Sequence, residues 1–311
     1  MTLIKKPHEL TVQTKIKALI YGQAGMGKTT LALSAPRPLL LDFDGGIHRV
    51  NYGHQADTVQ VKNWQECEDV LKENLSDFDT IIVDTGGKML DFMADAIIKK
   101  NPKMGRANGA LTLQGFGERK GMFRQFLRQI MMMNKHIIFV AHRDTKKNGE
   151  DDRFVPMFGG SSYEDLVTEL DLVGYLEADG KKRKLTFDPS DRNDGKNTCN
   201  LPSYMELPLV VDASGNALKN DFITKHVIEP YIANLQKRVE LAAQYNAVID
   251  EMKQEINLVT DAKSANDFVS RIGNFNHVGS SKIWAGQTLN AKCKELNLTF
   301  NKETKLYESA V

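Results

Sequence analysis

One short segment near the N-terminus constrains the fold more than any other part of the chain. Residues 22–29 read GQAGMGKT, which is the pattern G-x-x-x-x-G-K-[ST], and they lie between an apolar run at 15–21 and a helical pattern at 28–35. Glycines in such a loop let backbone N–H groups approach phosphate oxygens, because glycine has no Cβ and tolerates positive φ. The sequence therefore predicts a phosphate-binding loop between a buried strand and the start of a helix.

The same loop carries side chains for a nucleotide and a metal ion. Lys28 can reach the β- and γ-phosphates, and the hydroxyl of Thr29 can ligate Mg²⁺. We therefore expect ATP and Mg²⁺ as cofactors, and the absence of an Asn-Lys-x-Asp motif makes GTP the less favoured nucleotide. The residues expected to line the nucleotide are Gly22, Gln23, Ala24, Gly25, Met26, Gly27, Lys28, Thr29 and Thr30.

The rest of the chain alternates strand and helix patterns. Further apolar runs occur at 38–43, 57–61, 79–84 and 136–141, and helical patterns at 64–75, 86–99 and 116–134. This alternation predicts a mostly parallel sheet with helices on both faces. Alternating residues around Asp179-Gly180 predict a β-hairpin that extends the sheet.

The C-terminal part has a different pattern. Apolar residues recur at helical spacing over 228–256, and shorter helical segments follow at 262–273 and 281–296. We therefore expect an α/β domain over residues 1–215 and a smaller helical region over 216–311, serving oligomerisation or partner binding.

Three polar residues follow predicted strands. Asp84 ends the apolar strand Ile-Ile-Val-Asp and is a second candidate Mg²⁺ ligand beside Thr29. Asp44 follows the second strand and is our candidate to polarise the attacking water, although Asp42 and Asp44 could instead be loop caps without a catalytic role. His142 follows the strand at 136–141 and could hydrogen-bond the γ-phosphate. Parallel strands place their ligands at their carboxyl ends, so we expect these side chains to lie near the P-loop.

Together, the P-loop, Asp44, Asp84 and His142 resemble the RecA/RadA recombinase core, most closely the short RecA-core ATPases of phages associated with single-strand annealing. The resemblance covers about residues 14–205 and implies a RecA-like fold, ATP hydrolysis with Asp44 activating water, and a homo-oligomer. His142 matches a sensor position at which RecA itself has glutamine. The segment around Lys196 is similar to one whose lysine reaches ATP on the neighbouring subunit, which would make Lys196 catalytic in trans.

The resemblance also implies two DNA-binding loops, near 99–117 and 143–163. No acidic residue occurs between Asp95 and Glu118, so the first loop is locally basic, although a solvated basic surface would look the same. Phe154 and Phe158 could stack on bases or pack under the second loop. The candidate nucleic-acid contacts are Lys99, Lys100, Lys103 and Arg106 in the first loop, and Arg143, Lys146 and Lys147 in the second.

Composition limits the partners and the compartment. The formal net charge is +1, so attraction to nucleic acid must come from local basic segments. Cys67, Cys199 and Cys293 form no C-x-x-C pair, which argues against disulfides and zinc. With neither a signal-like segment in the first 14 residues nor 18 consecutive apolar residues, we expect a cytoplasmic protein without membrane contact, in the host cytoplasm if phage-encoded.

The preferred interpretation is a DNA-stimulated ATPase that binds single-stranded DNA in phage-type homologous recombination or annealing. Few residues precede the first strand, so we expect the N-terminal domains of many relatives to be missing. The C-terminal helices could then make the oligomer contact, or bind a single-strand binding or other recombination protein. A small-molecule or nucleotide kinase, and a non-hydrolysing ATP switch that recruits partners through these helices, remain alternatives.

Overall fold

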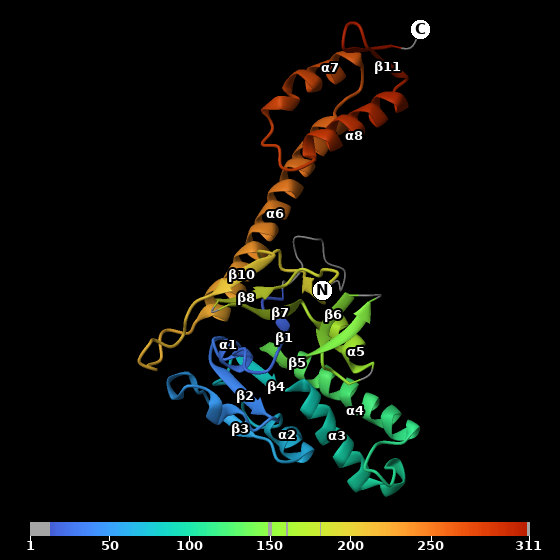
Figure 1. The fold of residues 1–311 in the computed structure, drawn as a ribbon. Coiled ribbons are helices and arrows are strands. Elements are labelled where there is room, and N and C mark those ends of the chain that lie inside the picture. Colours follow the sequence, from blue (N-terminus) through green and yellow to red (C-terminus); the bar gives the residue numbers. More distant parts are fainter. Residues whose placement is uncertain (1–12, 149–150, 160, 181, 310–311) are drawn as a thin grey trace. The chain divides into compact units, whose positions relative to one another are not determined.

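A computed structural model of the protein describes residues 13–148, 151–159, 161–180 and 182–309 (Figure 1). Contacts divide the chain into two units, Gln13–Ile232 and a second unit that begins at Ala233. No helix in these described ranges combines the length and the apolar character needed to cross a bilayer.

The first unit is built on a central sheet. Six strands run parallel in the spatial order β3-β2-β4-β5-β1-β7: β1 (Lys17–Gly22), β2 (Pro38–Asp42), β3 (Thr58–Gln60), β4 (Thr80–Asp84), β5 (His136–Asn148) and β7 (Leu172–Asp179). Antiparallel strands β8 (Lys182–Thr186) and β10 (Tyr204–Leu207) extend the sheet, and β9 (Lys196–Asn197) also pairs with β7. The predicted α/β fold class, with its added hairpin β7–β8 and its helical C-terminal region, is confirmed.

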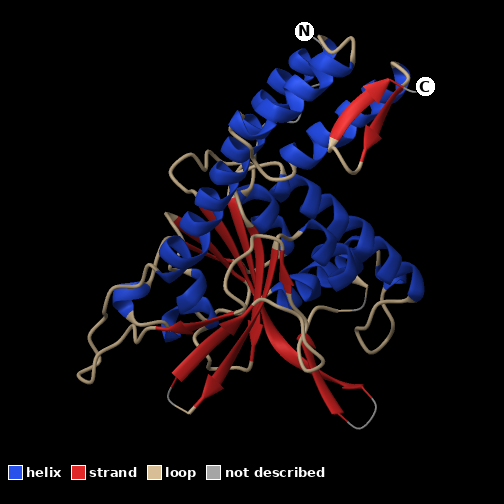
Figure 2. Cartoon of the chain, turned by 90° about the horizontal axis from the view of Figure 1, so that it is seen from above, coloured by secondary structure: helices blue, strands red, loops and turns tan. Residues whose placement is uncertain are grey.

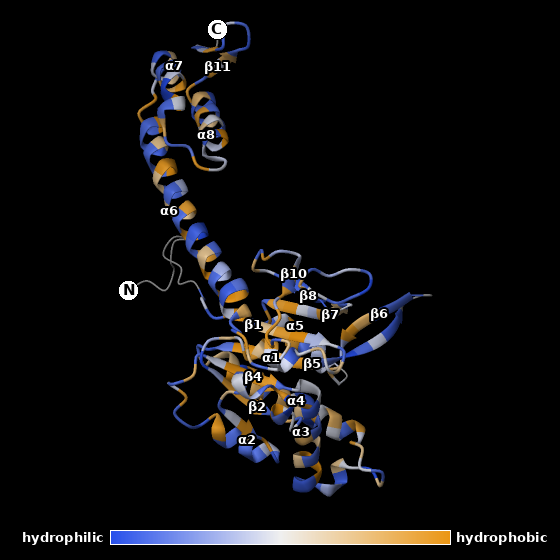
Figure 3. Cartoon of the chain, turned by 60° about the vertical axis from the view of Figure 1, so that its left-hand side comes forward, coloured by the Kyte–Doolittle hydropathy of each residue, from blue (hydrophilic) through white to orange (hydrophobic). Residues whose placement is uncertain are grey.

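Helices pack on both faces of this sheet (Figure 2). Alternate residues of the parallel strands, such as Leu41 and Phe139, join one core with α2 (Trp64–Val70), α3 (Gly86–Lys100), α4 (Leu113–Met131) and α5 (Ser162–Glu169). Their neighbours Leu40 and Ile138 are fully buried on the opposite face, and α1 (Lys28–Ala32) contacts β1 and β5. Burial on both faces explains why these strands read as continuous apolar runs, which Figure 3 shows as hydrophobic colour along the sheet.

Helix α4 begins three residues earlier than the helical pattern predicts. The hydroxyl of Thr112 accepts a hydrogen bond from the N–H of Gly115 at 3.1 Å, which caps the helix N-terminus before Leu113. The cap shortens the first predicted DNA-binding loop at its C-terminal end.

The predicted second DNA-binding loop is largely a β-hairpin, so the prediction of a loop there was wrong. Strand β5 continues to Asn148 and pairs antiparallel with β6 (Asp151–Pro156). Lys147 Nζ lies 2.7 Å from Asp152 Oδ1 across the ladder. The mixed charges that cancel in the sequence therefore pair across two strands.

The first unit continues past the expected domain end near residue 215. Asn220 Nδ2 donates to the carbonyl of Thr30, and the N–H of Ile223 donates to Ser34 Oγ, each at 2.8 Å. These bonds fix the π-helix Ile223–Ile228 against the end of α1, and α6 (Glu229–Asn257) follows directly. The contacts accordingly divide the chain after Ile232, whereas the sequence placed the division near 215.

The second unit has its own small core. Met252 of α6, Phe268 of α7 (Ala262–Arg271) and Leu289 of α8 (Ser281–Glu295) are buried together. The chain then forms a hairpin of β11 (Leu298–Asn301) and β12 (Leu306–Ser309), which the sequence analysis did not predict.

Candidate nucleotide-binding site

The strand register brings the predicted site residues to one edge of the sheet. Gly22 at the end of β1 is paired with His142 of β5, and Asp42 at the end of β2 is paired with Asp84 of β4. Because all four strands are parallel, their carboxyl ends open into one cavity of about 240 Å³. Its lining residues are Ala24, Gly25, Met26, Gly27, Lys28, Thr29, Thr30, Asp44, Gly46, Arg49, Val50, Asp84, Thr85 and His142.

The glycines of the P-loop are required for two different reasons. Gly25 and Gly27 have φ of 74° and 85°, a backbone conformation that side chains disfavour, although a Cβ there would meet nothing within 4 Å. At Gly22, a Cβ would lie 2.4 Å from the carbonyl oxygen of Leu176 in the neighbouring strand. Gly22 thus permits close strand packing, and the other two set the loop conformation.

Lys28 lies under the loop and is almost fully buried. Its Nζ donates to the carbonyl of Gln23 at 2.9 Å, so the ammonium is held at the inside of the loop. Burial lowers the pKa of Lys28, while the negative charges of Asp84 and Asp44 oppose that effect. The loop therefore holds a cation where phosphate oxygens would bind.

Thr29 and Asp84 provide adjacent oxygens for a metal ion. Thr29 Oγ1 donates to Asp84 Oδ2 at 2.5 Å. Burial raises the pKa of Asp84 to about 6, and the hydrogen bond from Thr29 partly offsets this effect. In the described part of the chain, no three His, Cys, Asp or Glu side chains are grouped to hold a metal by themselves. Two oxygens beside a phosphate cavity fit Mg²⁺, which keeps water and phosphate oxygens as its other ligands.

The two carboxylates after β2 have different environments. Asp42 is buried and accepts hydrogen bonds from the N–H groups of Gly46 and Ile47, at 3.0 and 3.1 Å. It therefore caps the 3₁₀ turn Ile47–Arg49, as the structural alternative for this residue holds. Asp44 instead faces the cavity, with its side chain 27% exposed and 3.5 Å from the Arg49 guanidinium.

His142 lies across the cavity from Asp44. Burial lowers the pKa of His142, and the nearby Lys28 charge acts in the same direction, so the imidazole is neutral at physiological pH. Its main-chain carbonyl accepts a hydrogen bond from the N–H of Met157 at 2.7 Å. His142 is thereby tied to the segment that follows β6.

A larger cavity adjoins the phosphate cavity and shares Met26, Gly27, Thr30 and Arg49 with it. Its volume of about 410 Å³ lies within the range typical of small-molecule sites. The other lining residues are Leu31, Asn51, His54, Arg183, Leu207, Pro208, Val210, Val211, Asn220 and Phe222. Sequence analysis missed this cavity, because the segment that closes it is irregular and carries no motif.

Lys196 lies outside the phosphate cavity of its own chain. It sits on β9 opposite Val173, which pairs with Leu19 in the middle of β1. That position is three residues before Gly22, or about 10 Å along the strand. Lys196 Nζ donates to the carbonyl of Val167 at 2.8 Å. Any contact of Lys196 with a nucleotide would therefore involve another copy of the chain.

The first group of candidate nucleic-acid residues is exposed and free of acidic partners. Lys99 and Lys100 end α3, Lys103 lies in the 3₁₀ turn Pro102–Met104, and Arg106 follows it. None of the four side chains forms an ion pair within the described part of the chain.

The second group is partly engaged by the protein. Arg143 donates to the hydroxyl of Tyr175 and stacks on the ring of Phe154, whereas Lys146 is exposed. Phe154 lies between Arg143 and Arg192 and is 9% exposed. Phe158 is also buried, against Phe139. Both phenylalanines pack under the hairpin and are not free to stack on bases.

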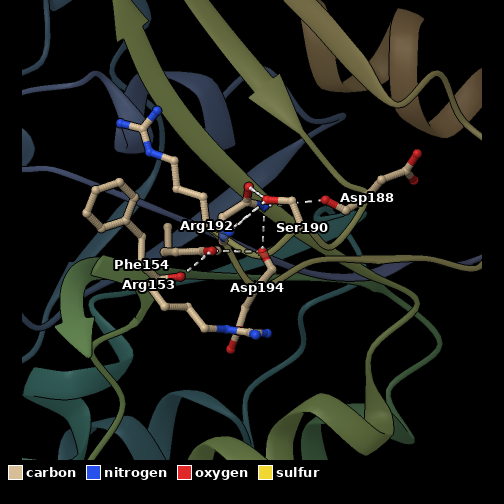
Figure 4. Close-up of polar contacts among 8 residues, drawn as sticks. Arg153, Phe154, Asp188, Ser190, Arg192 and Asp194 are labelled. Atoms are coloured by element: carbon tan, nitrogen blue, oxygen red, sulfur yellow. Dashed lines mark hydrogen bonds and ion pairs between the residues drawn. The ribbon is translucent and has the colours of Figure 1, made fainter. Parts of the chain in front are cut away.

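A polar network fixes the base of the hairpin (Figure 4). Arg153 pairs with Asp194 at 2.7 Å, and the N–H of Phe154 donates to the carbonyl of Arg192 at 2.7 Å. The hydroxyl of Tyr21 donates to the carbonyls of Phe154 and Asp194. Tyr21 directly precedes the P-loop, so the hairpin base is bonded to the strand that carries the nucleotide loop.

The strand–loop–helix unit, the Thr29–Asp84 pair and the carboxylate after the next strand define a RecA-like P-loop nucleotide-binding protein. A family model described as an AAA domain matches residues 14–199. The chain belongs to this family, and its first unit is an AAA-type P-loop ATPase domain.

Solved structures with a similar fold include the flagellar accessory protein FlaH from Methanocaldococcus jannaschii, at 13% identity and a TM-score of 0.37, with 66% of this chain and 89% of FlaH covered. A second solved structure, that of an isolated ATPase domain, matches at 11% identity and a TM-score of 0.38, with 67% of this chain and 86% of that domain covered. No curated protein sequence matches the chain.

Proposed function

We propose that the protein binds and hydrolyses Mg²⁺-ATP and acts on single-stranded DNA in phage-type homologous recombination or annealing. The observation that carries the proposal is the meeting of Lys28, Thr29, Asp84, Asp44 and His142 around one cavity. It joins phosphate binding, metal binding and a free carboxylate at the γ-phosphate end of a P-loop.

Each of these residues has a chemical role in the proposed reaction. The loop N–H groups and Lys28 hold the triphosphate, and Thr29 and Asp84 hold Mg²⁺, which neutralises phosphate charge when bound. Asp44 accepts a proton from the attacking water, and the neutral His142 donates a hydrogen bond to the γ-phosphate. The base occupies the larger adjoining cavity, whose lining is largely apolar.

The DNA part of the proposal is supported by charge and connectivity. Lys99, Lys100, Lys103 and Arg106 are cations without acidic partners in the described structure, as phosphate-contacting residues would be. His142 and Tyr21 both bond to the base of the β5–β6 hairpin, which carries Lys146 and Lys147. A change at the γ-phosphate would therefore reach the hairpin through hydrogen bonds.

Assembly and partners complete the proposal. Lys196 would supply charge to the nucleotide of a neighbouring subunit, so activity would require a homo-oligomer. The second unit, with its separate core, would bind a further copy or a single-strand binding or other recombination protein. These activities belong to the cytoplasm, in the host cell if the protein is phage-encoded.

Hydrolysis of ATP is expected to rise when single-stranded DNA is added, and specific activity is expected to rise with protein concentration. The measurement is steady-state phosphate release with and without DNA, with Lys28→Ala as background. Turnover that ignores DNA and protein concentration would contradict the DNA and trans-catalysis parts. Phosphate transfer to nucleosides or nucleotides would favour a kinase instead.

A charge variant serves as the control for DNA contact. Replacing Lys99, Lys100, Lys103 and Arg106 by glutamine should lower the salt dependence of DNA binding by a slope of about 3, at roughly 0.7 for each phosphate contact to a single strand. ATP turnover without DNA should stay unchanged. An unaltered salt slope would exclude these four residues from the interface.

A further inference from the structure

Two cations line the phosphate cavity among its described residues, Lys28 and Arg49. Lys28 belongs to the P-loop, but Arg49 comes from the 3₁₀ turn after β2 and has no place in the P-loop motif. Arg49 Nη2 lies 3.5 Å from Asp44 Oδ2 and packs over Gly46, where a Cβ would be 3.3 Å from it. The guanidinium thus lies beside the carboxylate that faces the cavity.

The backbone of Arg49 is fixed while its side chain is not. Asp42 caps the turn through the N–H groups of Gly46 and Ile47, and the N–H of Arg49 donates to the carbonyl of Gly46 at 3.0 Å. Ile47 and Val50, on either side, are buried. The Arg49 side chain is 63% exposed, and its long ion pair with Asp44 adds little stability. This arrangement suits a cation that binds a ligand better than one that holds the fold.

The charge of Arg49 reaches the whole γ-phosphate end of the cavity. It is close enough to His142 to contribute to the lowered pKa of that imidazole, after burial and Lys28. Arg49 therefore lies within electrostatic range of Asp44 and His142, the two residues that would face a terminal phosphate. A guanidinium can form two parallel hydrogen bonds to phosphate oxygens, which an ammonium cannot.

We propose that Arg49 binds the γ-phosphate from within the same chain and so distinguishes a nucleoside triphosphate from a diphosphate. The inference rests on the proposed ATP binding and adds a residue to it. On engaging the phosphate, Arg49 exchanges its ion pair with Asp44 for the terminal phosphate oxygens. The Asp44 carboxylate then remains available to accept a hydrogen bond from water.

The test compares binding of two nucleotides by calorimetric titration in the presence of Mg²⁺, using full-length protein. Arg49→Ala is expected to weaken binding of the non-hydrolysable triphosphate analogue AMP-PNP at least 10-fold and binding of ADP less than 2-fold. Arg49→Lys should recover part of the triphosphate affinity. The matched control is Arg37→Ala, because Arg37 is 58% exposed and paired with Asp79, away from the cavity.

Each other outcome overturns the inference in a distinguishable way. Equal losses for AMP-PNP and ADP would place Arg49 at the base or the inner phosphates, which the larger cavity would also allow. Unchanged binding of both nucleotides would make the Asp44 pair its only role. If the unaltered protein binds neither nucleotide, the proposed function fails, and this inference fails with it.

Discussion

Replacing Asp84 by asparagine is expected to stabilise the protein at neutral pH while slowing ATP hydrolysis by roughly 100-fold or more, about 3 kcal/mol of transition-state stabilisation. Burial raises the pKa of Asp84 from its ordinary 3.8 to about 6. A carboxyl group with a raised pKa favours the folded state below pH 3.8, and this contribution is lost as the pH rises through 6. At pH 7.5 the ionised, buried carboxylate therefore costs roughly 3 kcal/mol.

Asparagine removes that charge and keeps an oxygen that accepts the Thr29 hydrogen bond, but it binds Mg²⁺ weakly. Urea unfolding without nucleotide, measured from pH 4 to pH 8, should show little difference between the two proteins at pH 4 and a growing advantage for asparagine above pH 6. Asp77→Asn, an exposed change, should alter neither stability nor turnover. A stability difference that is constant across this range would contradict the burial argument.

Asp44→Asn is expected to lower the rate of ATP hydrolysis about 100- to 1,000-fold, within the range typical of a general base. The affinity for AMP-PNP should change little, because Asp44 is assigned to the water and not to the phosphates. Single-turnover hydrolysis with saturating nucleotide measures the chemical step separately from binding. Similar hydrolysis rates in the variant and the unaltered protein would remove Asp44 from the mechanism.

The neighbouring carboxylate provides the contrast for this prediction. Asp42→Asn leaves one acceptor oxygen where two backbone N–H groups now bond to a charged carboxylate, so it should cost about 1 to 3 kcal/mol of folding stability. The same loss of stability in Asp44→Asn would indicate that Asp44 is a structural residue as well.

The sequence predicts the nucleotide loop and the sheet well, because both depend on local pattern. The apolar runs match β1, β2 and β4 to within a few residues, since parallel strands are buried on both faces. The positions of Asp84 and His142 follow from the same pattern, because each ends a strand that neighbours β1 or lies one strand further in the sheet.

Features that depend on distant contacts were not predictable. The larger cavity is closed by His54 bonding the carbonyl of Val210, residues far apart in the chain. Nothing in the local sequence separates the cap Asp42 from the cavity residue Asp44, or shows that Arg49 returns to the site. The hairpin β5–β6 was missed because its charged strands lack an apolar period, and their pairing depends on cross-strand bonds.

Direct titration of Mg²⁺-ATP into the full-length protein and into Lys28→Ala tests the central claim, that the cavity at the end of β1 is the nucleotide site. The unaltered protein should bind one nucleotide per chain, and Lys28→Ala should bind at least about 100-fold more weakly, or roughly 3 kcal/mol, because the cation under the loop is lost. Equal binding by both proteins would contradict the assignment of this cavity as the ATP site.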